Sequence, residues 1–295
     1  MLTKRGIHKS TNTIKTKKMK ITNRYTIGAI ALAITSSSYA GDYAMPDKEP
    51  MTYEPESVIS GSLSFDYNSH FISYGFDVWG LGGSTFNDGL FNPSLELAWA
   101  LPGDTTFRIG TWWDVNDNAA NSIGGRIQEI DIWAGFDFNL GPVATSVVYQ
   151  SWIYGGTTEE ILDIILAVDT VLAPSLTIHN RLDAGASGGN EGTYWVLGID
   201  GFAFNDGVSF GGVDFSLPIN IGVAGNNFHG AAAGSSGYGY SSIGLSATYP
   251  LEFISSAYGE WDVHAGATWY HTDATNIANP TEDFWTANFG IGCSF

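Results

Sequence analysis

Apolar and polar side chains alternate along most of the chain after about residue 59. In 127–138, Ile130 and Ile132 fall on one face, and Glu129 and Asp131 fall on the other. A period of two with one apolar face predicts β-strands. Twelve such segments follow one another: 60–73, 92–101, 105–115, 127–138, 143–153, 159–169, 175–183, 192–202, 208–222, 238–249, 258–271 and 283–295.

The gaps between these segments alternate in length, and this predicts how the strands are connected. Tight turns are expected at 101–104, 139–142, 171–174 and 205–207, and longer loops at 74–91, 116–126, 223–237 and 272–282. Short turns at one end and long loops at the other are typical of bacterial outer-membrane barrels. The fold class is therefore an all-β, transmembrane, antiparallel up-and-down barrel of about twelve strands. An even strand number places both chain termini of the barrel on the side of the short turns, which is the periplasmic side.

The segment 159–169 has a second interpretation. Thr157 and Glu160 precede an apolar run at the spacing of a helix capping box, which favours a helix. Leu162 and Ile164 nevertheless alternate with Asp163, and a helix would break the even strand number. A strand is the better prediction.

The N-terminal region has the composition of an export signal. Basic residues such as Lys17 and Arg24 precede the apolar stretch 26–34, and small residues end at Ala40. This order predicts a secretory signal that is cleaved after Ala40. We divide the chain into an N-terminal extension with signal peptide (1–40), a flexible periplasmic leader (41–58) and the barrel (59–295). Translation could begin at Met1 or at Met19.

Charge and composition narrow the class further. The chain has 12 Lys and Arg against 30 Asp and Glu. Eight of the twelve basic residues precede Gly41, so the exported chain has a formal charge of 4 − 30 = −26. Such a charge excludes nucleic acid as a partner. The sequence also has no uninterrupted apolar run of about 18 residues, as a membrane-spanning helix requires.

Aromatic residues gather near the ends of the predicted strands. The ends toward the long loops carry Tyr74, Trp112, Trp113, Trp152, Tyr154, Tyr194, Trp195, Tyr238, Tyr240, Trp269, Tyr270 and Trp285. The ends toward the short turns carry Trp99, Phe136, Phe138, Phe202, Phe204, Phe210, Tyr249, Tyr258 and Phe295. Amphipathic rings favour the headgroup zone, so the pattern predicts two aromatic girdles. A soluble β-sandwich would place its aromatic residues in the middle of the strands, whereas here they lie mostly at the strand ends, with Trp133 as an exception.

The last strand carries the most specific pattern. Trp285, Phe289, Ile291 and Phe295 lie on its apolar face, and Phe295 is the final residue. A terminal aromatic on an amphipathic strand resembles the signal that the barrel-assembly machinery reads. We therefore expect these four residues to act as an assembly signal.

Two stretches resemble a known family. Ser64-Phe65-Asp66-Tyr67, which runs into 71–75, and the segment 129–136 are similar to the opening and middle strands of the TorF-family porins. The resemblance covers about the first half of the exported chain. It implies an outer-membrane barrel with a transport role and supplies no catalytic residues.

The sequence contains no recognisable catalytic or metal-binding motif. The histidines form no metal-ligand pair, and no nucleophile elbow is present. Asp114-x-Asn116-x-Asn118 partly matches a calcium loop but lacks its glycine and terminal glutamate. Cys293 is the single cysteine and cannot form an intramolecular disulfide. We expect no enzyme activity, no metal and no cofactor.

The polar face of the strands predicts the lumen. Its candidate pore-lining residues are Glu96, Arg108, Glu129, Asp131, Asp137, Asp163, Arg181, Asp214 and Asp262. Acids outnumber arginines there, and carboxylates in a narrow pore attract cations. The sequence thus predicts a porin-like channel for small solutes or cations, surrounded by outer-membrane lipid. The alternative is a non-conducting structural or adhesive barrel, and a membrane hydrolase is a third class.

Overall fold

The computed structural model describes residues 59–83, 86–119, 123–183, 189–203, 208–225, 228–230 and 236–295. The predicted signal peptide, the leader and the predicted turn at 205–207 lie outside these ranges. The described chain contains no α-helix with the length and apolarity needed to cross a membrane.

Strands make up most of the described residues. They are β1 (Ile59–Asn68), β2 (Ile72–Ser73), β3 (Phe76–Asp77), β4 (Leu90–Leu101), β5 (Thr105–Val115), β6 (Ile127–Leu140), β7 (Val143–Ile153), β8 (Thr158–Val168), β9 (Ser175–Asp183), β10 (Gly192–Asp200), β11 (Val208–Phe210), β12 (Val213–Ser216), β13 (Pro218–Ala224), β14 (Gly237–Pro250), β15 (Glu260–Thr272) and β16 (Asp283–Ser294). Two 3-10 helices, η1 (Phe86–Asp88) and η3 (Ser256–Tyr258), lie between strands.

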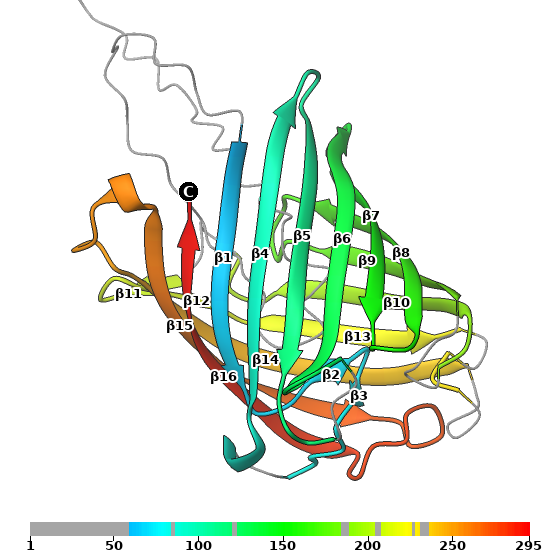
Figure 1. The fold of residues 1–295 in the computed structure, drawn as a ribbon. Helices are drawn as coiled ribbons and strands as arrows, with labels where there is room; N and C mark the ends of the chain where they lie inside the picture. Colours follow the sequence, from blue (N-terminus) through cyan, green and yellow to red (C-terminus); the bar gives the residue numbers. More distant parts are fainter. Residues whose placement is uncertain are drawn as a thin grey trace, which may run out of the picture.

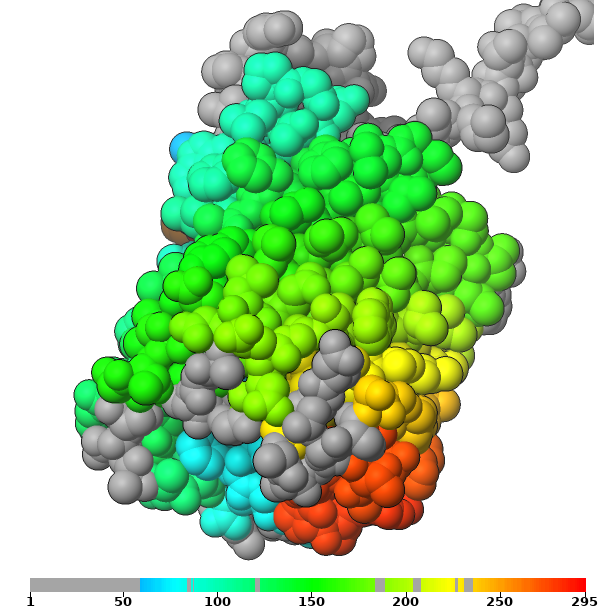
Figure 2. Space-filling view, turned by 90° about the vertical axis from the view of Figure 1, so that its right-hand side faces the viewer, coloured from blue at the N-terminus to red at the C-terminus, as the bar shows by residue number. Residues whose placement is uncertain are grey.

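Each strand of the wall pairs with the wall strands that precede and follow it in the chain, and the strands close into a barrel (Figure 1). β1 pairs antiparallel with both β4 and β16, and β14 pairs with β15, which completes the ring. β12 and β13 together occupy one position in the wall, beside β14. The closed antiparallel barrel therefore has twelve strands, as predicted. Figure 2 shows one side of this wall, where the colours follow one another in sequence order.

Alternate side chains of each wall strand face opposite environments. In β6, Asp131 and Trp133 are 3% and 4% exposed, whereas Ile132 between them is 49% exposed. The apolar set thus covers the outside, and the polar set faces the interior. Because every wall strand has two partners, the ring leaves no unpaired edge, which is the condition for backbone in a bilayer.

Most predicted boundaries agree with the observed strands to within two residues, and the choice of strand for 159–169 is correct. The predicted segments 105–115, 143–153 and 175–183 coincide with β5, β7 and β9. The segment 159–169 is strand β8, which pairs with β7 and β9 along its length.

Two predicted strands are wrong in detail. The segment 208–222 is interrupted because Gly211 and Gly212, with φ of 63° and 81°, turn the chain between β11 and β12. Glycine adopts this left-handed backbone without the steric cost that a side chain imposes. The segment 60–73 is also too long, because β1 ends at Asn68 and the chain then turns into the barrel.

Candidate functional site in the barrel lumen

Charged side chains gather in the interior of the barrel, and the first group joins strands β4, β5 and β6. Arg108 lies with its Nη1 2.9 Å from Glu96 Oε2 and its Nε 3.2 Å from Asp137 Oδ2. Trp133 donates from its indole nitrogen to the same Glu96 oxygen at 2.8 Å. The guanidinium lies between two carboxylates and balances the charge of one, so this group adds one negative charge rather than two to the lumen.

A second group is built on β8 and β9. Arg181 Nε donates to Glu159 Oε2 at 3.0 Å, and its Nη1 donates to the carbonyl oxygen of Phe228 at 2.8 Å. The guanidinium carbon lies 4.1 Å from the centre of the Phe228 ring, a cation–π contact. Glu159 was not among the predicted pore-lining residues. It has the same strand parity as Asp163, and this signal could have identified it.

Next to it, His179 on β9 is fully buried. Its Nδ1 lies 2.7 Å from Asp163 Oδ1, and the Tyr74 hydroxyl also contacts this nitrogen. Gln150 Nε2 donates to the other Asp163 oxygen at 2.6 Å. Asp163 is therefore held by its neighbours and is not a free carboxylate at the pore surface.

A third group joins β15, near the end of the chain, to β1, the first strand of the barrel. His264 on β15 places Nε2 2.6 Å from Asp66 Oδ1 and Nδ1 2.9 Å from Asp262 Oδ1. Gly290 of β16 lies between β15 and β1, and any β-carbon there would meet both Asp66 and His264 at 2.4 Å. A ring with a carboxylate at each nitrogen donates from both, which only the imidazolium form can do. His264 thus supplies a further positive charge.

Glu129 and Asp131 of β6 form a carboxyl pair. Both side chains are 3% exposed, and they hydrogen-bond to each other. Two carboxyl groups can do so only if one of them carries a proton. Glu129 Oε1 and Asp131 Oδ1 have no hydrogen-bond partner in the structure.

The nine predicted pore-lining residues lie on the inner face of the barrel wall, and eight of them belong to separate groups of contacting side chains. Asp214 stands apart, exposed near the turn end of the barrel, where it pairs with Thr248 across the sheet. The described residues contain no group of three or more His, Cys, Asp or Glu side chains that could hold a metal ion. The arrangement can provide a polar, acidic surface, although most acids deep in the wall are paired.

The loop end of the barrel is filled by apolar side chains, which corrects the predicted girdle. Tyr74, Trp112, Trp152, Tyr194, Tyr240 and Tyr270 are 0–7% exposed and lie inside. Trp113, Trp195, Tyr238 and Trp285 are 37–64% exposed and remain on the outside. Neighbouring residues of a strand face opposite sides, so aromatics at the same strand end separate into an outer girdle and an inner core.

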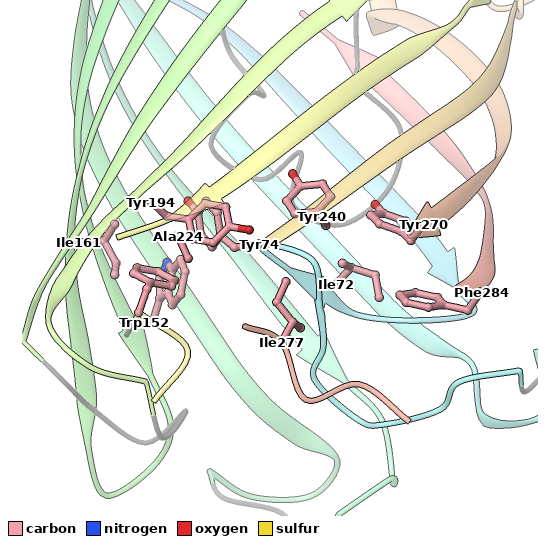
Figure 3. Packing of buried hydrophobic residues seen from close by; sticks show 11 residues of the cluster. Ile72, Tyr74, Trp152, Ile161, Tyr194, Ala224, Tyr240, Tyr270, Ile277 and Phe284 are labelled. Atoms are coloured by element: carbon pink, nitrogen blue, oxygen red, sulfur yellow. The ribbon is translucent and has the colours of Figure 1, made fainter. Parts of the chain in front are cut away.

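This inner core is built around a segment that folds into the barrel. Residues 69–83, here called the lumen hairpin, contain β2 and β3, and Figure 1 shows them at the end of the barrel opposite the C-terminus. One buried cluster contains Ile72, Tyr74, Trp152, Ile161, Tyr194, Ala224, Phe228, Tyr240, Tyr270, Ile277 and Phe284. Figure 3 shows these side chains gathered in the interior, with Tyr74 beside Tyr194, and the two ring centres are 5.3 Å apart.

Two ionisable groups of the loop end have perturbed pKa values. Burial raises the pKa of Asp77, whose Oδ2 accepts a hydrogen bond from Gly82 N at 2.7 Å. Burial and the nearby Arg181 lower the pKa of His229 from 6.5 to about 3. His229 is therefore neutral in the folded loop at every pH above about 3.

Acidification is expected to destabilise the loop end through His229. Its folded pKa lies below its unfolded value, so the unfolded chain binds more protons as pH falls below 6.5, and stability decreases toward pH 3. Between pH 7 and pH 5 the loss is at most about 2 kcal/mol. The melting temperature in detergent should fall across this range, and fall less in His229→Gln. Equal pH dependence in both proteins would contradict this assignment.

The closed ring and its apolar exterior define the class of the protein. A barrel with Ile132 and Phe289 about half exposed on its outer face, and charged groups inside, has the surface that lipid requires. The protein is an integral outer-membrane β-barrel.

No protein-family model and no curated protein matches the chain in sequence. Solved structures with a similar course of the chain include the KdgM porin, at 8% identity and a TM-score of 0.43, covering 79% of this chain and 99% of that one. The NanC porin has 9% identity and a TM-score of 0.41, covering 80% and 98%. The translocator domain of the autotransporter NalP from Neisseria meningitidis has 11% identity and a TM-score of 0.40, covering 80% and 87%.

The class of the protein follows from the closed strand pairing and the apolar outer face of the barrel. Membership of the TorF family is not confirmed by these comparisons and stays a prediction.

Proposed function

We propose that this barrel is an outer-membrane, porin-like channel for passive diffusion of small solutes, with a preference for cations. The observation that carries the proposal is the excess of acid on the lumen side. Ten of the acids there are Asp66, Glu96, Asp114, Glu129, Asp131, Asp137, Glu159, Asp163, Asp214 and Asp262. Between residues 59 and 295 the sequence has no lysine and three arginines.

The excess remains after the ion pairs are counted. Arg126 lies outside the lumen, paired with Asp117, and both side chains are about 70% exposed. One proton shared by Glu129 and Asp131 leaves nine of the ten acids negative. Arg108, Arg181 and the His264 imidazolium supply three positive charges, and 9 − 3 leaves six negative charges. A negative potential within low-dielectric walls concentrates cations and repels anions.

The test of ion preference is a planar-bilayer measurement of reversal potential in a KCl gradient. Asp163→Asn with Asp214→Asn removes two negative acids that have no arginine partner among the described contacts, so the preference for K⁺ should decrease. The decrease should be largest at low salt, where screening lengths approach about 30 Å at about 0.01 M. The matched control is Asp104→Asn with Asp169→Asn, which neutralises two exposed acids in the turns. A wild-type channel without preference for K⁺ over Cl⁻ would remove the cation part of the proposal.

A non-conducting structural or adhesive barrel is the second candidate, and the filled loop end favours it. Tyr74, Phe228 and Ile277 are 0–2% exposed inside the barrel. The same bilayer measurement separates the two functions, because a structural barrel should show no discrete conductance steps.

We further propose that the barrel is not an enzyme. Among the described contacts, His179 and His264 face carboxylates rather than a serine hydroxyl. Ser69 does contact His70 Nδ1 at 2.7 Å, but the two side chains are 4% and 2% exposed. Ser69 Oγ also accepts from Ala287 N, and His70 Nε2 lies 2.8 Å from the carbonyl oxygen of Gly82. These contacts anchor the lumen hairpin, and ester turnover in detergent would contradict the proposal.

A further inference from the structure

The lumen hairpin is bound to several parts of the barrel that lie far apart around the ring. At its start, Ser69 N donates to the carbonyl oxygen of Ala287 on β16 at 2.9 Å. Trp79 Nε1 donates to Asp114 Oδ2 on β5 at 2.9 Å, and the Tyr74 hydroxyl contacts His179 on β9. β16 and β9 are separated on either side by several strands of the ring. The hairpin therefore crosses the interior and does not merely line one wall.

The hairpin also packs into two separate buried clusters. Ile72 and Tyr74 belong to the cluster that contains Tyr194 and Phe228. Phe71 belongs to a second cluster with Leu90, Trp112, Trp133 and Val148, against which Val78 and Trp79 pack. Aromatic side chains of the hairpin thus pack into two different clusters of wall residues inside the lumen.

The tip of the hairpin has a backbone that only its surroundings can hold. Tyr74 has φ of 49°, a left-handed conformation that is unfavourable for a bulky side chain, and Gly75 follows with φ of 83°. Asn279 Nδ2 donates to the carbonyl oxygen of Gly75 at 2.8 Å, and Asn279 Oδ1 accepts from Asp77 N at 2.8 Å. Such conformations persist where contacts over-determine them, and they gather at functional sites.

The wall toward the turn end has a different character. Strands β12 to β14 present small polar side chains to the interior there, among them Ser216, Ser246 and Asn220, and Ser216 Oγ lies 2.6 Å from Ser246 Oγ. No aromatic side chain belongs to these contacts. Bulky aromatic groups therefore gather around the hairpin.

We propose that the lumen hairpin is the constriction of the pore, and that the Tyr74 and Trp79 rings determine which solutes pass. The inference rests on the proposed channel function and deepens it. The two rings reach His179 and Asp114, on opposite sides of the β6–β8 wall. The two rings select solutes by size, whereas the lumen acids select them by charge.

The experiment compares Tyr74→Ala and Trp79→Ala with wild type in planar bilayers. Single-channel conductance should rise by roughly two-fold or more, and larger poly(ethylene glycol) molecules should enter the pore. Tyr74→Phe keeps the ring and removes the hydroxyl, so its size limit should remain that of wild type. Tyr238→Ala and Trp285→Ala, which remove outward rings at the same end, are the matched controls. Heat-modifiable gel mobility identifies folded barrels, and two independent variants guard against misfolding of one.

Three outcomes are distinguishable. A larger size limit in either folded alanine variant, with unchanged controls, supports the constriction, including the case in which wild type is closed. Equal conductance and equal size limit in wild type and both folded variants overturn the constriction and leave the channel function intact. Absence of conductance in every folded barrel overturns the channel function and the constriction with it.

Discussion

Replacing Ile132 by arginine is expected to destabilise the barrel by ~2–4 kcal/mol, because the new charge would lie in lipid near the middle of the membrane. Ile132 is 49% exposed on the outer face of β6, between the buried Asp131 and Trp133. Phe289→Arg on β16 should have a similar cost, since Phe289 is 53% exposed on the same outer surface. The free energy of unfolding in lipid vesicles is the measurement.

The control is Ser246→Arg on β14. Ser246 is 9% exposed and contacts Ser216 inside the barrel, so an arginine there can reach lumen water and acids. The loss of stability should be much smaller than at Ile132 or Phe289. Equal losses at all three positions would show that the assignment of inner and outer faces is wrong.

Deleting Phe295 is expected to leave exported but unassembled protein in the periplasm. Phe295 exchanges two backbone hydrogen bonds with Gly61, of 2.8 and 3.0 Å, at the seam where the last strand meets the first. Without Phe295, the seam between β1 and β16 loses these two backbone hydrogen bonds at its end. The proposed signal for the assembly machinery also loses its terminal aromatic. Heat-modifiable mobility and membrane yield measure the result.

Two further variants separate seam closure from a general effect of aromatic residues. A β-carbon at Gly61 would lie 2.5 Å from the Phe295 ring, so Gly61→Val should weaken the same seam. Phe253→Ala removes a ring that is 83% exposed near the same end and should assemble normally. Normal assembly of the Phe295 deletion would contradict both the seam and the signal.

The strand pattern was predictable from the sequence because it is a local property. A period of two shows which residues share a face, and the turn residues show where the chain reverses. β5, β7 and β9 were located to the residue for this reason. The interruption at Gly211 and Gly212 was missed although the apolar positions change phase there, from Val208 and Phe210 to Val213 and Phe215. A Gly-Gly pair at such a change of phase is a hairpin-turn signal.

The candidate site was predictable only in part. Alternation places Arg108 and Asp163 on the inner face, but it cannot show that Asp163 is held by His179 and Gln150. The contact between His264 and Asp66 joins residues 198 positions apart, and it forms only because closure brings β15, β16 and β1 together. Which charges pair is decided by strand order around the ring.

The sequence by itself determined the class of the protein, because alternating strands, short turns and an apolar outer face are each properties of neighbouring residues. Only the tertiary structure decided what fills the lumen. Tyr74 follows an amphipathic strand like other girdle candidates, yet it contacts His179, 105 positions away, from inside the barrel. A loop can turn outward or inward with the same local pattern, and the choice depends on the side chains that the closed wall presents to it.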